Sequence, residues 1–187
     1  MVLPAEYPDH EEELSRALFA ALMELMQTVP IDKLSVGEIT ARAHVSRASF
    51  YRRYKDKYDL LNRSYERILE NTLFTVHQGT KWKEAIYKIY RVIGEHAAFF
   101  NNAFCSSDQN SLRNYIFDRT MRLEMEILQR QGVDVTKPAV QYRLRSYVAG
   151  GLELTVTWVR EGAVFPLEEL VEIFVEMVPV QFQRYFV

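Results

Sequence analysis

Apolar residues recur at steps of three and four along most of the chain, which is the spacing of one face of an α-helix. The first such stretch runs from His10 to Val29, and Pro30 closes it because proline cannot donate a helical hydrogen bond. Another begins near Lys57 and stops near Gly79. No segment shows the sustained alternation of apolar and polar residues that is typical of a β-strand. The pattern therefore predicts an all-α fold.

Two short helices are predicted in the interval between these long stretches. Ser35 and Glu38 have the spacing of a capping box, in which each side chain bonds the backbone N–H of the other residue, so a helix should begin after Ser35. His44 lies in the turn that follows, and Ser46 is a suitable N-cap for the second short helix. Two short helices joined by a tight turn are typical of a helix-turn-helix, here spanning about residues 35–54.

The remainder of the chain is predicted to be helical as well. Gly150 and Gly151 lie inside one of these helices, where each costs roughly 0.5–1 kcal/mol relative to alanine, so a close helix–helix approach is expected there. The last two helices carry apolar residues on wide arcs, which fits a four-helix bundle shared between two subunits; an ordinary intramolecular core is the alternative. The helices predicted after Gly79 are Trp82 to Phe100, about Leu112 to Gln131, a stretch from after Thr136 to Gly162, and Pro166 to Pro179.

Charge is distributed unevenly along the chain, although the formal net charge of its 187 residues is only −2. Between Lys33 and Lys57, seven basic residues stand against two acidic ones, which gives this segment +5 and leaves −7 for the rest. Positive charge concentrated in one short segment is typical of a surface that binds a polyanion. A solvated basic helix face is the alternative reading of the charge alone.

Composition and motifs argue against several other classes of protein. The single cysteine, Cys105, cannot form an internal disulfide, and the N-terminus has no secretion signal. No apolar run is long enough to span a membrane, so a cytoplasmic protein without membrane contact is expected. The four histidines are scattered, and neither a Gly-rich phosphate loop nor a nucleophile elbow occurs, so no metal, cofactor or enzyme activity is expected. Glu124 and Glu126 lie on different faces of their helix and form no obvious acid–base pair.

The second short helix has an exposed side that suits contacts with base edges. Phe50 and Tyr54 are expected to face the core, so the remaining side chains near the helix N-terminus can enter the major groove. Arginine can donate two hydrogen bonds to guanine there. Helix N-termini are natural phosphate sites, which makes Ser35 and Lys57 candidates for backbone contacts. The predicted DNA-contacting residues are Arg47, Ala48, Ser49 and Arg52, with Arg47, Ser49 and Arg52 as base readers, and Ser35, Tyr51 and Lys57 as backbone clamps.

Residues 39–61 resemble the signature of the TetR family of transcriptional regulators, I-A-x-x-A-G-V-S-x-x-T-F-Y-x-H-F-x-x-K-x-x-L. The sequence departs from it at Thr40, His44 and Arg53, which replace alanine, glycine and histidine. The position of His44 often needs a positive φ, which histidine tolerates better than most residues. The resemblance implies that the tyrosine and the lysine clamp the DNA backbone. The matching positions include Ile39, Ala43, Val45, Ser46, Phe50, Tyr51, Lys57 and Leu60, with conservative changes at Ser49 and Tyr54.

The resemblance also implies a helix-turn-helix DNA-binding domain, residues 1–57, and a helical regulatory and dimerisation domain, residues 58–187. The implied protein is a repressor that binds a pseudo-palindromic operator in double-stranded DNA as a homodimer, joined through its last two helices, and responds to an unknown small-molecule inducer. An activator or partner-protein-dependent regulator, and a helical ligand-binding protein or enzyme with a vestigial motif, are the alternatives. Aromatic residues crowd the middle of the regulatory domain, and the candidate polar anchors for a ligand are His77, His96, Tyr115 and Arg119.

Overall fold

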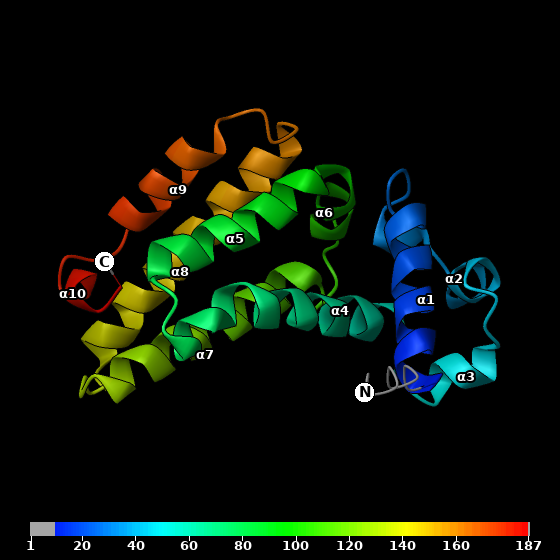
Figure 1. Cartoon of the computed structure of the whole chain (residues 1–187), viewed down its shortest axis with the longest axis horizontal. Coiled ribbons are helices and arrows are strands. Elements are labelled where there is room, and N and C mark those ends of the chain that lie inside the picture. The colour runs from blue at the N-terminus through cyan, green and yellow to red at the C-terminus, as the bar shows by residue number, and fades with distance from the viewer. Residues whose placement is uncertain (1–9, 187) are drawn as a thin grey trace, which may run out of the picture.

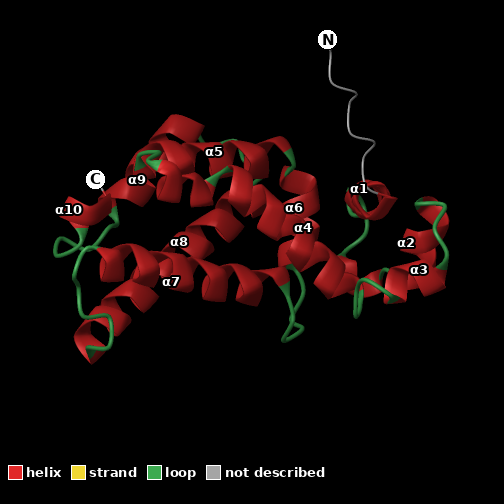
Figure 2. Ribbon diagram, turned by 60° about the horizontal axis from the view of Figure 1, so that its bottom comes forward, coloured by secondary structure: helices red, strands yellow, loops and turns green. Residues whose placement is uncertain are grey.

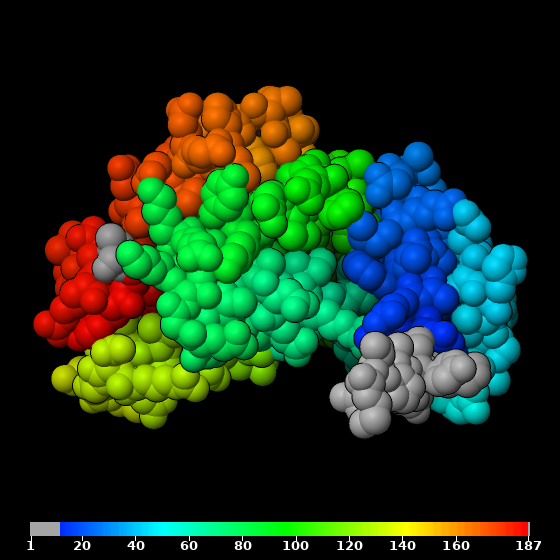
Figure 3. Space-filling model, in the orientation of Figure 1, coloured from blue at the N-terminus to red at the C-terminus, as the bar shows by residue number. Residues whose placement is uncertain are grey.

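The computed structural model describes residues 10–186, and within that range the chain is helical with no strand. Helices α1–α3 form one end of an elongated molecule and α5–α10 form the other, with α4 extending from the first group into the second (Figures 1 and 3). This confirms the predicted all-α fold. The elements are α1 (His10–Leu25), η1 (Ile31–Lys33), α2 (Val36–Arg42), α3 (Arg47–Tyr51), α4 (Lys57–Asn71), η2 (Leu73–Gln78), α5 (Trp82–Glu95), α6 (Ala97–Phe104), α7 (Leu112–Arg130), α8 (Pro138–Arg160), α9 (Leu167–Glu176) and α10 (Gln183–Phe186).

The first three helices pack around a small core of their own. Leu18 and Leu22 of α1, Ile39 of α2 and Phe50 of α3 are all fully buried. Tyr54 is buried as well, and its hydroxyl lies 3.0 Å from Ser15 Oγ on α1. Helices of seven and five residues are not stable alone, so α2 and α3 depend on this shared core. The same packing fixes the angle between them.

The predicted stretch from Lys57 to Gly79 is broken at Thr72, whose backbone leaves the helical region with φ −126° and ψ −86°. The Thr72 hydroxyl donates to the Ile68 carbonyl at 2.6 Å, and the Thr75 hydroxyl donates to the Thr72 carbonyl. Such side-chain bonds compete with the helical ladder. A short 3₁₀ segment follows and ends at Gly79, whose φ of 95° suits glycine.

The larger group of helices surrounds a second core. Helix α8 lies between α5 and α7 in the turned view of Figure 2, and α9 packs against α5. The predicted helix from Trp82 to Phe100 is divided at His96, where φ is −123° and ψ is 34°, so α5 and α6 are separate. Sequence patterning also missed α10, which follows Pro179.

The close approach expected at Gly150 and Gly151 is confirmed. A Cβ atom built on Gly151 would lie 2.4 Å from Cε2 of Phe174 on α9, and one on Gly150 would lie 2.9 Å from Cε of Met177. The Phe174 ring therefore rests on the backbone of α8. Only a residue without a side chain allows α8 and α9 to pack at this separation.

Candidate nucleic-acid interface and internal cavity

Helix α2 begins with the expected capping box. The Ser35 hydroxyl oxygen accepts from the Glu38 backbone N–H at 3.2 Å, and the Ser35 backbone N–H donates to Glu38 Oε2 at 2.8 Å. The bonds from the Ser35 hydroxyl and backbone lower the pKa of the Glu38 carboxyl. Ser35 thus fixes the start of α2, where a phosphate contact was also predicted.

The turn between α2 and α3 has the strained geometry expected at His44. Its φ is 55°, in the left-handed region that glycine adopts at little cost. The Val45 backbone N–H donates to the Thr40 carbonyl at 2.9 Å, which closes the end of α2. Ser46 then caps α3, since its hydroxyl oxygen accepts from the Ser49 backbone N–H at 3.0 Å.

Helix α3 presents its predicted contact residues to solvent. Phe50 is fully buried, whereas Tyr51 is 57% exposed. The two rings pack edge-to-face with their centroids 5.3 Å apart. Arg47, Ala48 and Arg52 are exposed, and Ser49 is half-buried. Arg52 Nη2 donates to Ser49 Oγ at 2.9 Å, so these two side chains form one polar patch.

Arg47 lies across the start of α2. A Cβ atom at Gly37 would stand 2.2 Å from Arg47 Nη2, so the guanidinium rests directly over this glycine. The Arg47 side chain therefore extends from the N-terminus of α3 to that of α2. The N-terminus of each helix carries a partial positive charge, which favours anions. The guanidinium of Arg47 adds a full positive charge at the same place.

Lys57 joins α4 to the segment before α2. Its ammonium donates to the carbonyls of Asp32 at 2.9 Å and Leu34 at 2.8 Å. Asp56 caps α4, because its carboxylate accepts from the Asp59 backbone N–H at 2.8 Å. An ammonium group has three donors, and the Asp32 and Leu34 carbonyls accept from two of the three donors of Lys57.

Two of the four residues predicted to anchor a ligand share a partner, and the two histidines lie elsewhere. Tyr115 donates to Glu66 Oε2 at 2.6 Å, and Arg119 Nε and Nη2 donate to the same carboxylate at 2.9 and 2.5 Å. Burial works against the charged form, yet the bonds from Arg119 and Tyr115 lower the pKa of Glu66. His77 Nδ1 lies 2.9 Å from Arg130 Nη1, and His96 is exposed at the junction of α5 and α6.

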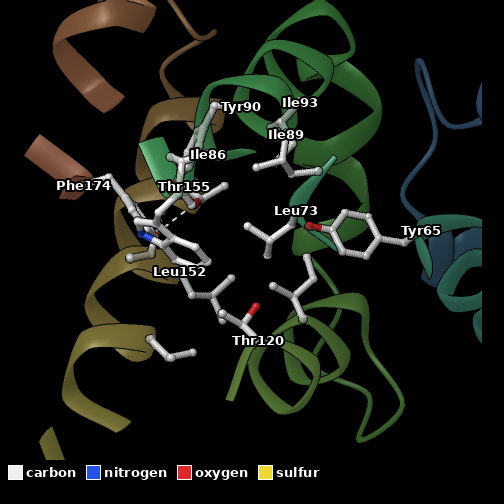
Figure 4. A pocket seen from close by; sticks show the side chains of 14 residues that line it. Tyr65, Leu73, Ile86, Ile89, Tyr90, Ile93, Thr120, Leu152, Thr155 and Phe174 are labelled. Carbon is white, nitrogen blue, oxygen red and sulfur yellow. Dashed lines mark hydrogen bonds between the residues drawn. The ribbon is translucent and has the colours of Figure 1, made fainter. Parts of the chain in front are cut away.

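An internal cavity of about 50 Å³ lies in the larger group of helices, lined mainly by apolar and aromatic side chains (Figure 4). The four predicted anchors, all described by the structure, are not among its lining residues. The Tyr65 and Thr120 hydroxyls point into the space, and Tyr90 bonds Thr155 at 2.7 Å on one wall. Sequence patterning marked these helix faces as core but could not show that they leave a space. The lining residues are Tyr65, Leu73, Trp82, Ile86, Ile89, Tyr90, Ile93, Ile116, Thr120, Val148, Gly151, Leu152, Thr155 and Phe174.

Two family models match this chain. Residues 18–63 match "Bacterial regulatory proteins, tetR family", and residues 80–179 match "Transcriptional regulator C-terminal region". Uncharacterized HTH-type transcriptional regulators of Mycobacterium bovis and Mycobacterium tuberculosis are each 25% identical to it over 151 residues, which are 79% of this chain and 67% of theirs. None of the described helices has the length and apolar character that crossing a bilayer requires.

Solved structures share the fold at low identity. The dihydroxyacetone kinase operon activator DhaS superposes with a TM-score of 0.65 at 18% identity, covering 93% of this chain and 98% of that one. A TetR transcriptional regulator from Streptococcus agalactiae gives 0.63 at 19%, covering 90% and 94%. Thermus thermophilus FadR, solved with lauroyl-CoA, gives 0.53 at 19%, covering 88% and 92%.

Proposed function

This chain belongs to the TetR family of bacterial regulatory proteins, and from that premise we propose that it is a homodimeric repressor whose α3 reads an operator and whose larger domain binds a small-molecule inducer. The observation that carries the proposal is the exposed face of α3. Arg47, Tyr51 and Arg52 are exposed there, while Phe50 behind them is fully buried. A rigidly anchored helix with a basic outer face is what major-groove reading requires.

The predicted contacts divide by role. Arg47, Ser49 and Arg52 are proposed to read base edges, because they stand near the N-terminal end of α3 or in its polar patch. Tyr51 and Lys57 are proposed to hold phosphates, as is Ser35 at the start of α2. Ala48 lets the helix approach the bases closely because its side chain is small. Two copies would place two such helices on a pseudo-palindromic site.

Fluorescence anisotropy with labelled duplexes from the promoter region of the gene tests DNA binding. We expect the wild type to prefer a promoter duplex over a scrambled one of equal length. Arg47→Ala should weaken the specific complex about ten- to hundredfold, since a bidentate arginine–guanine pair contributes about 1–3 kcal/mol. Tyr51→Phe should weaken specific and scrambled complexes alike, because a phosphate contact carries no sequence information.

Arg91→Ala is the matched control, since Arg91 is an exposed arginine of α5. It should leave DNA affinity unchanged. A wild type that binds promoter and scrambled duplexes equally at moderate salt would contradict the proposal.

A second candidate is an activator, or a regulator that works through a partner protein. It is favoured by the similarity of the fold to a protein named as an operon activator, and by the small volume of the cavity, about 50 Å³. Transcripts of the neighbouring genes in a deletion strain separate the two. Loss of a repressor raises those transcripts, whereas loss of an activator lowers them.

A further inference from the structure

Glu124 of α7 is buried without a counter-ion. Its side chain is 0% exposed, and neither carboxylate oxygen has a hydrogen-bond partner among the residues that the structure describes. Buried carboxylates in proteins are nearly always paired, because an isolated buried charge is very costly. Burial accordingly raises the pKa of Glu124 well above its ordinary value. An unpaired group of this kind requires an explanation.

Glu66, another acidic side chain that contacts α7, has the partners that Glu124 lacks. Glu66 is only half-buried, yet the chain supplies it with the guanidinium of Arg119 and the hydroxyl of Tyr115. Arg119 and Glu124 belong to the same helix, α7, but Arg119 forms its ion pair with Glu66, the more exposed of the two carboxylates. Within residues 10–186 no cation is bonded to Glu124, so its carboxyl is either kept neutral by a proton or compensated by a cation that the described residues do not supply.

Two further buried polar groups, those of Trp82 and Tyr147, are linked to Glu124 in this part of the core. The Trp82 indole Nε1–H makes no well-aligned hydrogen bond within residues 10–186, although it lies close to the Tyr147 hydroxyl. Burial raises the pKa of Tyr147 most, the charge of Glu124 raises it further, and a poorly aligned hydrogen bond from the Trp82 side chain lowers it. The Tyr147 hydroxyl makes only a long bond of 3.4 Å to the Phe174 carbonyl. Glu124 is thus one member of a buried polar cluster with unused bonding capacity.

This cluster adjoins the internal cavity. Trp82 is one of the residues that line the cavity. Glu124 is not itself a lining residue, but it follows Ile116 and Thr120, which are, at successive four-residue steps on the same face of α7. Four aromatic rings form much of the wall: Tyr65, Trp82, Tyr90 and Phe174. The faces of aromatic rings attract cations, and the wall contains no basic side chain. Both the ring faces and the unpaired carboxylate favour a positively charged occupant.

We propose that this cavity binds a small organic cation, an amine with an apolar body, whose ammonium group is the counter-ion of Glu124. The apolar body occupies the aromatic and aliphatic walls, and the ammonium donates to the buried carboxylate in place of a protein cation. An anionic ligand would add a second uncompensated charge. The proposal deepens, and rests on, the ligand-responsive role proposed above.

Ligand entry would displace the helices that lead to the DNA-binding end. The cavity of about 50 Å³ is far smaller than the ~150 Å³ space that admits benzene, so the walls must move apart. Tyr65 belongs to α4, and Arg119 of α7 bonds Glu66 of the same helix. A shift of α7 around a bound amine therefore carries α4, which begins directly after the turn that follows α3. A form with α4 displaced is the one that the amine selects.

Calorimetry and thermal unfolding of the full-length protein with a series from n-butylamine to n-octylamine test the inference. Each amine is compared with the primary alcohol of the same length, which has nearly the same shape and no charge. We expect at least one amine to bind the wild type about ten- to hundredfold more tightly than its alcohol, as hydrogen bonds to buried charged groups do. Glu124→Gln should reduce that ratio to below about twofold.

Glu126→Gln is the matched control, because Glu126 is an exposed carboxylate two residues further along α7. It should keep the preference for the amine. Glu124→Met serves as a second neutral variant if the glutamine variant does not fold. The proposal is overturned if no amine outbinds its alcohol, or if Glu124→Gln retains the preference.

Anisotropy on promoter DNA in the presence of the amine separates this inference from the proposed function. Amine binding that depends on Glu124 but leaves DNA affinity unchanged would keep the site and contradict its regulatory role. Specific DNA binding without any preference for amines would support the proposed regulator and contradict the proposed ligand class.

Discussion

At the scale of single residues, the turn between α2 and α3 carries backbone strain. His44 has a φ of 55°, and a side chain in the left-handed region costs roughly 1–2 kcal/mol. Glycine removes that cost but adds freedom to the unfolded chain, so we expect His44→Gly to raise the free energy of unfolding by about 0.5–1 kcal/mol in urea titrations. His44→Val should lower it, since a β-branched residue fits the turn worse. A less stable glycine variant would contradict the strain argument.

Glu124 makes stability depend on pH. Its pKa is raised in the folded protein, so the folded state holds the proton more tightly than the unfolded state does. The free energy of unfolding should therefore fall as pH rises above 4.5, the ordinary pKa of this carboxyl, towards the raised folded value. Glu124→Met removes the buried group, so it should stabilise the protein at pH 8 by about 1–3 kcal/mol.

The advantage of Glu124→Met should shrink towards pH 4.5, where the wild-type carboxyl is protonated in the folded state and half-protonated in the unfolded state. Thermal unfolding of both proteins at pH 4.5, 6 and 8 measures the difference. An advantage that stays constant across these values would mean that Glu124 does not titrate with a raised pKa.

At the scale of elements, helix starts were easier to predict than helix interruptions. Ser35 and Ser46 cap α2 and α3 as predicted, and Asp56 caps α4 in the same way, because a cap acts through a backbone N–H two or three residues away. The breaks at Thr72 and His96 were not predicted. Neither has a proline or glycine at the break, and periodicity continues through both, so only packing and side-chain bonds reveal them.

The same limit applies to the candidate site. The exposed side of α3 follows from which residues are apolar, and it was predicted correctly. That Glu124 and Glu126 occupy different faces of α7 was also predicted, and the first is buried while the second is exposed. The absence of a partner for Glu124 within residues 10–186 depends on which helices surround α7, and no local pattern in the sequence contains that information.

Gly150 and Gly151 provide a matched test of helix packing. A Cβ at position 151 would clash with the ring of Phe174. That ring is packed between the rings of Tyr90 and Tyr147, with centroids 5.4 Å away in each case, so it has little room to move aside. Gly151→Ala should therefore destabilise the fold by about 1–3 kcal/mol. Gly150→Ala meets only the flexible end of Met177, so it should be neutral or stabilising by up to about 1 kcal/mol. Urea denaturation of both variants measures this, and equal effects would contradict the packing.

At the scale of the whole molecule, α4 couples the two groups of helices. Asn62 near its start donates to the Asn110 carbonyl at 3.0 Å, and Glu66 one turn later bonds Tyr115 and Arg119 of α7. On the other side, Asn102 of α6 donates to the Met26 carbonyl at 2.9 Å. The DNA-binding end is thus tied to the larger domain by hydrogen bonds as well as by the chain, which is what a ligand-dependent change in DNA affinity requires.

The last helices leave apolar side chains exposed on one face of this molecule. Ile173 and Met177, one turn apart on and just after α9, are 39% and 36% exposed, and Tyr142 of α8 is 73% exposed. Tyr142 and Met177 line a shallow surface groove together. Apolar side chains on neighbouring helices are what a shared four-helix bundle would cover, so a second copy of the chain is the expected occupant.

Replacing both Ile173 and Met177 with glutamate should therefore convert the expected dimer to a monomer, measured by light scattering after gel filtration. The monomer should also bind a two-half-site operator about a hundredfold or more weakly, because the second recognition helix no longer binds at the effective concentration that dimerisation provides. Its affinity for a single half-site should not change, which separates loss of dimerisation from damage to α3. Val164→Glu, a similar charge on an 81% exposed valine between α8 and α9, is the control and should remain dimeric. A double variant that stays dimeric would place the interface elsewhere on the molecule.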